Sequence, residues 1–81
     1  MNISLDGVVT HRCGMCGARS SIALTEKELA AFKLYLSGGR LIQACLPGLN
    51  KCEREFLKSG YCRECQELLF GNGESERIKR A

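Results

Sequence analysis

The chain has 81 residues, of which 44% are hydrophobic and 26% are charged, and its formal net charge is +3. This composition excludes a disordered chain, and the length allows one domain whose apolar core is too small to be comfortably stable unaided. The mild positive charge permits nucleic-acid binding without demanding it.

The first predicted element is a β-hairpin over residues 8–24, built around Cys13 and Cys16. Residues 8–12 lead into the turn, and residues 19–24 lead out of it. In a Cys-x-x-Cys turn both sulfur atoms can reach one metal ion, so we predict a zinc knuckle here.

A helix follows, and it begins with a capping box. The Thr25 hydroxyl accepts a hydrogen bond from the third amide of the helix, and the Glu28 carboxylate reaches back. The helix is predicted to continue to about Ser37, because the glycine pair 38–39 ends it. Its mostly apolar stripe comprises Leu29, Phe32, Lys33 and Leu36.

Two more helices are predicted before the second cysteine pair. A short one covers residues 40–45 and ends at the Leu-Pro-Gly run 46–48. Asn50, with Glu53 three residues later, predicts the N-cap of a third helix that continues to about Lys58.

The second Cys-x-x-Cys pair is Cys62 and Cys65, and residues 66–70 after it are predicted to be helical. A helix start suits thiolates, because its amides and its dipole favour negative charge. Residues 71–81 are rich in Gly, Glu, Ser and Arg, and we expect a flexible basic tail there. Residues 1–70 are therefore predicted to form a single zinc-binding domain.

These elements predict a small zinc-stabilised α+β fold, in which a β-hairpin zinc knuckle is joined by three to four short helices. The layout is similar to a treble clef or a zinc ribbon. One structural Zn²⁺ is predicted, with Cys13, Cys16, Cys62 and Cys65 as its ligands. Four thiolates leave no open position for water, and no nucleophile–base pair is evident, so we do not expect an enzyme.

Alternatives remain for the other candidate residues. His11 is either a replacement ligand or a neighbour that hydrogen-bonds to a ligand sulfur. Cys45 and Cys52 are interpreted as small core residues; the alternatives are a disulfide between them, redox sensitivity, or a place in an alternative set of metal ligands. Redox chemistry at either cysteine pair lacks the βαβ context that it needs. The acid pairs Glu26/Glu28 and Glu53/Glu55 do not face each other on a helix, so we expect them to be solvated.

Several motifs occur in order along the second half of the chain: Gly38-Gly39 before Ile42-Gln43, a Leu46-Pro47 turn, the run Arg54–Gly60, and a closing Cys-x-x-Cys. Together they resemble a family of small, largely uncharacterised zinc-finger-like proteins encoded by bacteriophages and prophages. The resemblance covers about half of the chain, and the first cysteine pair also matches the family.

Two departures from the family pattern stand out. Gln66 occupies a position where the family often has an aromatic residue, and the family usually lacks Cys45 and Cys52, which supports their interpretation as non-ligands. The resemblance implies a mobile-element origin and the cytoplasm of a host bacterium, and it brings no assigned activity. The absence of a signal-peptide pattern and of an apolar run near ~18 residues agrees with a cytoplasmic protein that does not bind membranes.

We therefore expect a non-catalytic interaction protein that binds and modulates a protein partner of the host or the phage. The alternative is a nucleic-acid-binding zinc finger acting in transcription or replication. In that case Arg12, Arg19 and Arg63, with the basic residues 77–80, contact phosphates. Scattered charge and the lack of an aromatic stacking platform favour the protein partner.

Overall fold

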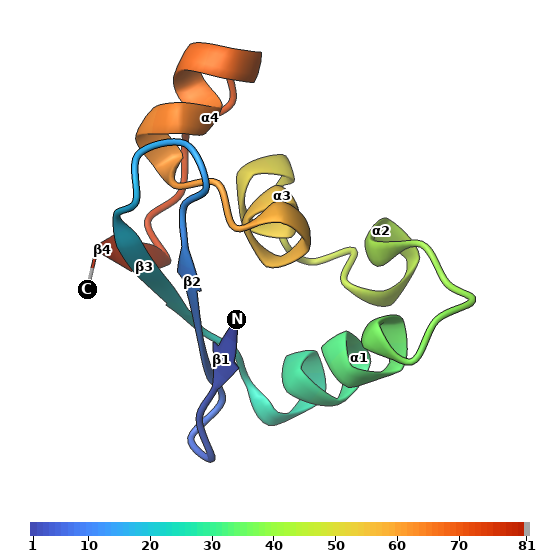
Figure 1. The fold of residues 1–81 in the computed structure, drawn as a ribbon. Coiled ribbons are helices and arrows are strands. Elements are labelled where there is room, and N and C mark those ends of the chain that lie inside the picture. The colour runs from blue at the N-terminus through green and yellow to red at the C-terminus, as the bar shows by residue number, and fades with distance from the viewer. Residues whose placement is uncertain (81) are drawn as a thin grey trace.

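The predicted hairpin is present at the centre of an antiparallel sheet (Figure 1). In this computed structural model, which describes residues 1–80, β2 (Val8–Arg12) pairs with β3 (Arg19–Ala23). Two strands that the sequence does not predict extend the sheet, β1 (Asn2–Ile3) beside β2 and β4 (Ile78–Arg80) beside β3.

Residues 1–80 also contain four helices, close to where the caps predict them. They are α1 (Glu26–Leu36), α2 (Ile42–Cys45), α3 (Lys51–Ser59) and α4 (Arg63–Phe70). Both capping boxes are formed: Thr25 accepts a hydrogen bond from the Glu28 amide, and Asn50 accepts one from the Glu53 amide. The prediction of a small α+β fold with three to four short helices is confirmed at this level.

The apolar stripe of α1 differs in part from its prediction. Phe32 is fully buried, but Leu36 is 46% exposed because the helix ends at that residue and its last turn projects beyond the core. Tyr35, one position earlier, stacks on Phe32 with 6.1 Å between ring centroids and takes the place expected for Leu36.

One face of the sheet packs against the helices. Val9, Ile22 and Ile78 lie opposite one another across β2, β3 and β4, and all three are buried. They join Phe32 of α1 and Phe56 of α3 in the main apolar core. The strands gather at one side of the molecule, and α1, α2 and α3 extend away from them, with α4 near the hairpin turn (Figure 1).

The C-terminal segment departs from the predicted flexible tail. Ile78 is buried opposite Ile22, and β4 completes the sheet. The folded unit therefore extends past residue 70, to the end of the described residues, and only Ala81 of the predicted tail lies outside them. The prediction missed β4 because three residues of strand are too short to stand out, and their partner lies more than fifty residues earlier.

Candidate metal centre

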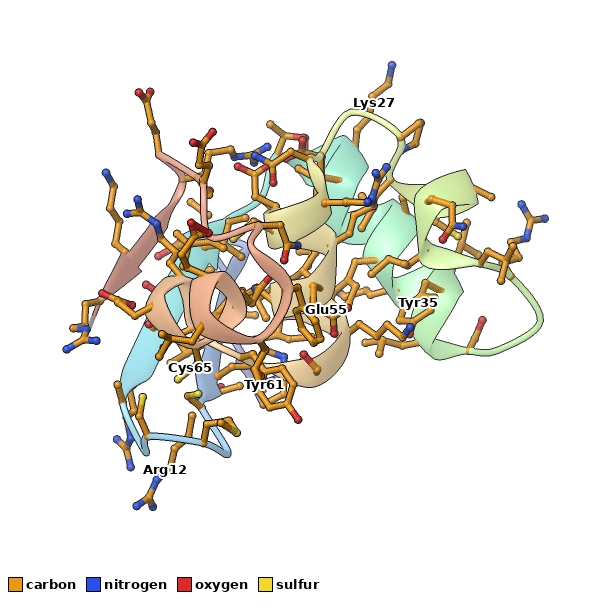
Figure 2. All side chains as sticks on the ribbon, turned by 90° about the horizontal axis from the view of Figure 1, so that it is seen from above. Arg12, Lys27, Tyr35, Glu55, Tyr61 and Cys65 are labelled. Atoms are coloured by element: carbon orange, nitrogen blue, oxygen red, sulfur yellow. The ribbon has the colours of Figure 1, made fainter. Side chains whose placement is uncertain are left out.

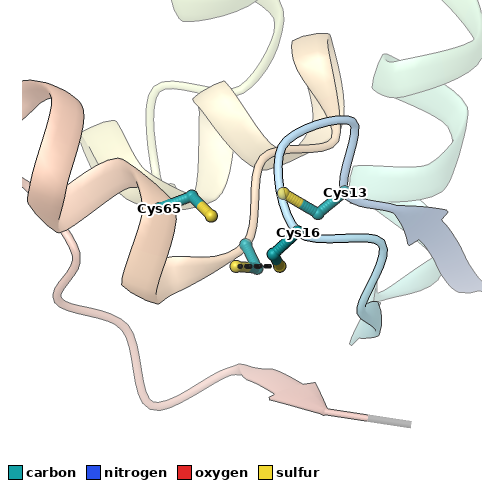
Figure 3. A group of neighbouring side chains, drawn as sticks. Cys13, Cys16 and Cys65 are labelled. Carbon is teal, nitrogen blue, oxygen red and sulfur yellow. Dashed lines mark hydrogen bonds between the residues drawn. The ribbon is translucent and has the colours of Figure 1, made fainter.

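The two cysteine pairs meet where the hairpin turn approaches the start of α4 (Figure 3). The four sulfur atoms of Cys13, Cys16, Cys62 and Cys65 all lie within 4.8 Å of one another. The Sγ atoms of Cys16 and Cys62 are 3.6 Å apart. Cysteines that are far apart in the sequence are thus brought to one point by the fold.

The hairpin turn is shaped by backbone hydrogen bonds around the first pair. The Cys13 amide donates to the Ala18 carbonyl at 2.8 Å, and the Gly17 amide donates to the Cys13 carbonyl at 2.9 Å. Gly17 adopts φ +77°, a conformation in which a side chain is strained. The turn therefore needs a glycine at this position to bring both sulfurs to the same side.

The second pair depends on another glycine. Gly60 ends α3 with φ +83°, and a Cβ added there would lie 2.7 Å from the His11 ring nitrogen. The chain then enters α4, in which Cys62 is the N-cap residue and Cys65 lies in the first turn. The Cys65 amide in this turn, together with the helix dipole, favours negative charge on the Cys62 sulfur.

The donor set fits a metal ion that prefers thiolates. In a tetrahedral zinc site with Zn–S bonds of about 2.3 Å, neighbouring sulfurs lie about 3.8 Å apart. The 3.6 Å between Cys16 and Cys62 is already close to that distance, and the 4.8 Å limit for the whole cluster means that the widest pairs need to close by about 1 Å at most. The four cysteines can therefore hold one metal ion, and they leave no vacant position on it for a substrate.

The four thiols are not equivalent. Burial by itself would raise the pKa of Cys13. Hydrogen bonds from the amides of Cys62, Cys16 and Met15 and from the Cys65 thiol outweigh burial and lower this pKa to about 6. The hydrogen bond to Cys62 and burial raise the pKa of Cys65, and burial raises the pKa of Cys62. Cys13 therefore ionises first, and its charge opposes a second ionisation until a cation compensates it.

His11 does not belong to the cluster. Within residues 1–80, the metal-binding group consists of the four cysteines alone. His11 Nε2 instead lies 3.3 Å from the Leu57 carbonyl oxygen, and its ring meets Phe56 edge-on at 5.3 Å. Burial lowers the pKa of this histidine, so it is a neutral packing residue at neutral pH.

The two remaining cysteines also lie outside the cluster, and all six cysteines are free thiols. Cys52 is buried in the main core, and burial raises its pKa to about 11. Cys45 is half-buried against the same core. The interpretation of both as packing residues agrees with these positions.

Gln66 is a residue of the site that the sequence does not reveal. Its side chain is fully buried, and Nε2 donates to the carbonyl oxygens of Cys52 and Tyr61, each at 3.0 Å. Its Oε1 accepts a hydrogen bond from Asn72. Gln66 thereby ties the start of α4 to α3. The only sequence signal for Gln66 is its position directly after the last cysteine, and a glutamine there would ordinarily be expected at the surface.

The three arginines of the alternative function do not form one patch. Arg12 and Arg19 face each other across β2 and β3, next to the cysteine turn, and Figure 2 shows Arg12 at that end of the molecule. Arg63 lies on α4, where its Nε donates to the Gly73 carbonyl at 3.3 Å, in a hollow shared with Glu64 and Glu67. Arg63 is thus set among acids.

The outer half of α4 is apolar and uncovered. Leu68 is 85% exposed, Leu69 44% and Phe70 57%. The Phe70 ring lies 6.3 Å from that of Tyr61, which packs against the buried cysteines. Phe70 therefore lies outside the core, because α4 projects beyond the sheet (Figure 1).

No known family model, curated protein or solved structure matches this chain. None of the helices within residues 1–80 is both long enough and apolar enough to cross a membrane.

Proposed function

We propose that this protein is a non-catalytic interaction module, which one structural Zn²⁺ stabilises and which binds a protein partner. The observation that carries the proposal is the convergence of Cys13, Cys16, Cys62 and Cys65, from two distant segments, within 4.8 Å. A closed thiolate site of this kind supplies folding free energy and offers no catalytic position. A knuckle turn facing a helix start also supports a treble-clef-like arrangement.

A protein partner is supported by the uncovered end of α4. Three consecutive large apolar residues, Leu68, Leu69 and Phe70, cost solvation free energy unless another surface covers them. The metal cluster holds the base of this helix, so the apolar end is presented on a rigid support. The bacterial, phage-encoded origin and the cytoplasmic setting that we propose rest on the resemblance described above.

Metal content tests the first part of the proposal. The chain, purified without added metal, should contain about one zinc ion, and Co²⁺ in its place should give the absorption spectrum of tetrahedral thiolate ligation. A folded chain that contains no metal, or a cobalt spectrum of octahedral oxygen ligation, would contradict it.

Partner capture by variants tests the second part. Leu68→Ser/Phe70→Ser should retain zinc and lose a partner that the wild type captures, and the purified pair should bind with a negative heat-capacity change. The matched control is Leu41→Ser, which removes a leucine that is also exposed, outside α4. The same set of captured proteins for all three chains would contradict the role of α4.

A further inference from the structure

The face of the sheet that points away from the helices is basic and lacks acids. Val8, Thr10 and Arg12 of β2 alternate with the core-facing residues, and their cross-strand neighbours in β3 share their face. We call this surface the outer face, and none of its residues is buried. It consists of Asn2, Val8, Thr10, Arg12, Arg19, Ser21, Ala23 and Lys79.

Charge is distributed unevenly between strands and helices. Four of the twelve Lys and Arg residues lie in the strands, whereas none of the nine Asp and Glu residues does. Arg80 belongs to the core-facing side and pairs with Glu64 at 3.3 Å. Neither of the two ion pairs within residues 1–80 involves Arg12, Arg19 or Lys79. The outer face therefore carries three cations without an internal counter-charge.

Two of these cations are placed in direct opposition. Arg12 lies opposite Arg19 in the register, and like charges at directly opposed positions destabilise a sheet. A bound anion between the guanidinium groups would remove that repulsion. The two arginines also line a hollow of about 260 Å³, together with Met1, Asn2, Thr10 and His11, and no acid lines it. The side chains of Asn2 and Thr10 can donate to phosphate oxygens.

We propose that the outer face of the sheet binds the phosphate backbone of duplex nucleic acid, with Arg12 and Arg19 on one phosphate and Lys79 on another. The Thr10, Ser21 and Asn2 side chains add neutral donors along the same face. This surface differs from the α4 end that we propose for the protein partner, so the module joins a protein to nucleic acid.

The composition of the face favours duplex backbone over other polyanions. The strands contain no Phe, Tyr or Trp, so there is no platform on which the bases of a single strand could stack. Met1, which is 60% exposed, is the one large apolar residue that lines the hollow, and a single residue does not make the apolar face that membrane-binding elements require. Backbone contact without base readout predicts binding that is independent of DNA sequence.

Arg12 has a second possible role, because its guanidinium lies near Gly17 in the cysteine turn. There its positive charge could offset the dianionic zinc–thiolate group instead of binding an external phosphate. The two roles predict different effects of replacing Arg12: a loss of bound zinc in the first case, and a loss of nucleic-acid binding in the second.

The test is fluorescence anisotropy of zinc-loaded protein with a labelled mixed-sequence 20-base-pair DNA duplex, over a series of salt concentrations. Two phosphate contacts predict a slope of about −1.8 for log affinity against log salt, which is about 12-fold weaker binding at 200 mM than at 50 mM. Arg12→Gln/Arg19→Gln should reduce the slope to about −0.9 and keep its zinc. Lys79→Gln, away from the cysteines, should lower the slope by about 0.9 with zinc retained.

The control Arg40→Gln/Arg63→Gln removes the same charge from outside the sheet and should keep the wild-type slope. Leu68→Ser/Phe70→Ser should also keep it. Three results would overturn the proposal: no duplex binding at 50 mM salt, equal losses in the two double-arginine variants, or a Lys79→Gln slope equal to that of the wild type. Preferential binding to single strands or to phosphatidylserine vesicles would overturn it as well.

Discussion

The four ligand sulfurs differ in how far water reaches them. Cys13, Cys62 and Cys65 are buried, while Cys16 at the tip of the turn is exposed. Replacing a buried cysteine by serine leaves a polar hydroxyl in a buried position, besides the loss of one candidate metal ligand. The cost of a substitution should therefore depend on which cysteine is replaced.

Replacing Cys62 should remove most of the fold. Cys62→Ser loses a ligand at the fully buried N-cap of α4, and the metal affinity on which folding depends falls with it. Zinc content after gel filtration and far-UV circular dichroism measure the outcome. Cys45→Ala is the control and should retain both, because Cys45 lies outside the cluster. A folded, zinc-containing Cys62→Ser protein would disprove the four-cysteine assignment.

Glu28 is a second residue whose charge matters. Arg77 donates to both of its carboxylate oxygens, at 2.6 and 3.1 Å, and these hydrogen bonds hold its pKa at about 2. Because the folded pKa is lowered, the stabilisation is complete above the unfolded value of 4.5 and is lost as the pH falls towards 2. The side chain is partly screened by water, at 23% exposed, so we expect about 1.5 kcal/mol.

Glu28→Gln keeps the capping geometry and removes the charge. Urea denaturation at pH 7 should show it about 1.5 kcal/mol less stable than the wild type. The difference should fall by more than half at about pH 3, and comparison between the two chains cancels the acid loss of metal common to both. Glu26→Gln, on the exposed side of α1, should change little. An equal effect of both substitutions would contradict the ion pair.

At the scale of elements, the C-terminal segment connects two helix starts to the sheet. Each capping acid uses one oxygen for its own helix: Glu28 accepts from the Thr25 amide and Glu53 from the Asn50 amide. The C-terminal segment also binds both acids, through Arg77 to Glu28 and through the Ser75 hydroxyl to Glu53 at 2.6 Å. The prediction that Glu28 and Glu53 are solvated is therefore wrong, because both carboxylates are held by these hydrogen bonds. Residues 75–78 therefore stabilise α1 and α3 from outside.

This role predicts that β4 contributes to stability. Ile78→Ala should lower the free energy of unfolding by about 2–5 kcal/mol, because Ile78 is buried between the sheet and the core. Urea denaturation in excess zinc measures the effect. Lys79→Ala, one residue later and exposed, is the matched control and should lie within about 0.5 kcal/mol of the wild type. A flexible tail would make the two variants alike.

At the scale of the whole molecule, the interior has two separate parts. The apolar core joins the sheet to α1, α2 and α3, and a second cluster consists of Cys13, Cys62 and Cys65 with Tyr61 against them. The hairpin turn and the first turn of α4 meet at this second cluster, which has no large aliphatic side chain to hold it together. A metal ion, which the four cysteines can hold, would link the hairpin turn to the first turn of α4.

Removing the metal should unfold the chain cooperatively. Zinc binding at such sites is worth on the order of 10 kcal/mol, which is comparable to the whole stability of a small domain. A strong chelator should abolish the thermal transition seen by circular dichroism, and added zinc should restore it. An unchanged melting temperature after chelation, with zinc shown to be gone, would mean that the apolar core suffices.

The sequence by itself determined the features whose causes lie within a few residues. The cysteine pairs and the capping residues at 25 and 50 act through the backbone next to them, so their turns and helix starts can be read directly. The pairing of the two cysteine turns also followed, because four thiolates satisfy one tetrahedral ion.

Only the tertiary structure decided the contacts between distant segments. Arg77 and Glu28 are 49 residues apart, and β4 has a partner near the other end of the chain. The separation of Arg63 from Arg12 and Arg19 and the burial of Gln66 depend on the same packing. The physical reason is that many pairings of such short segments have similar local energies, and only burying the shared core selects one of them.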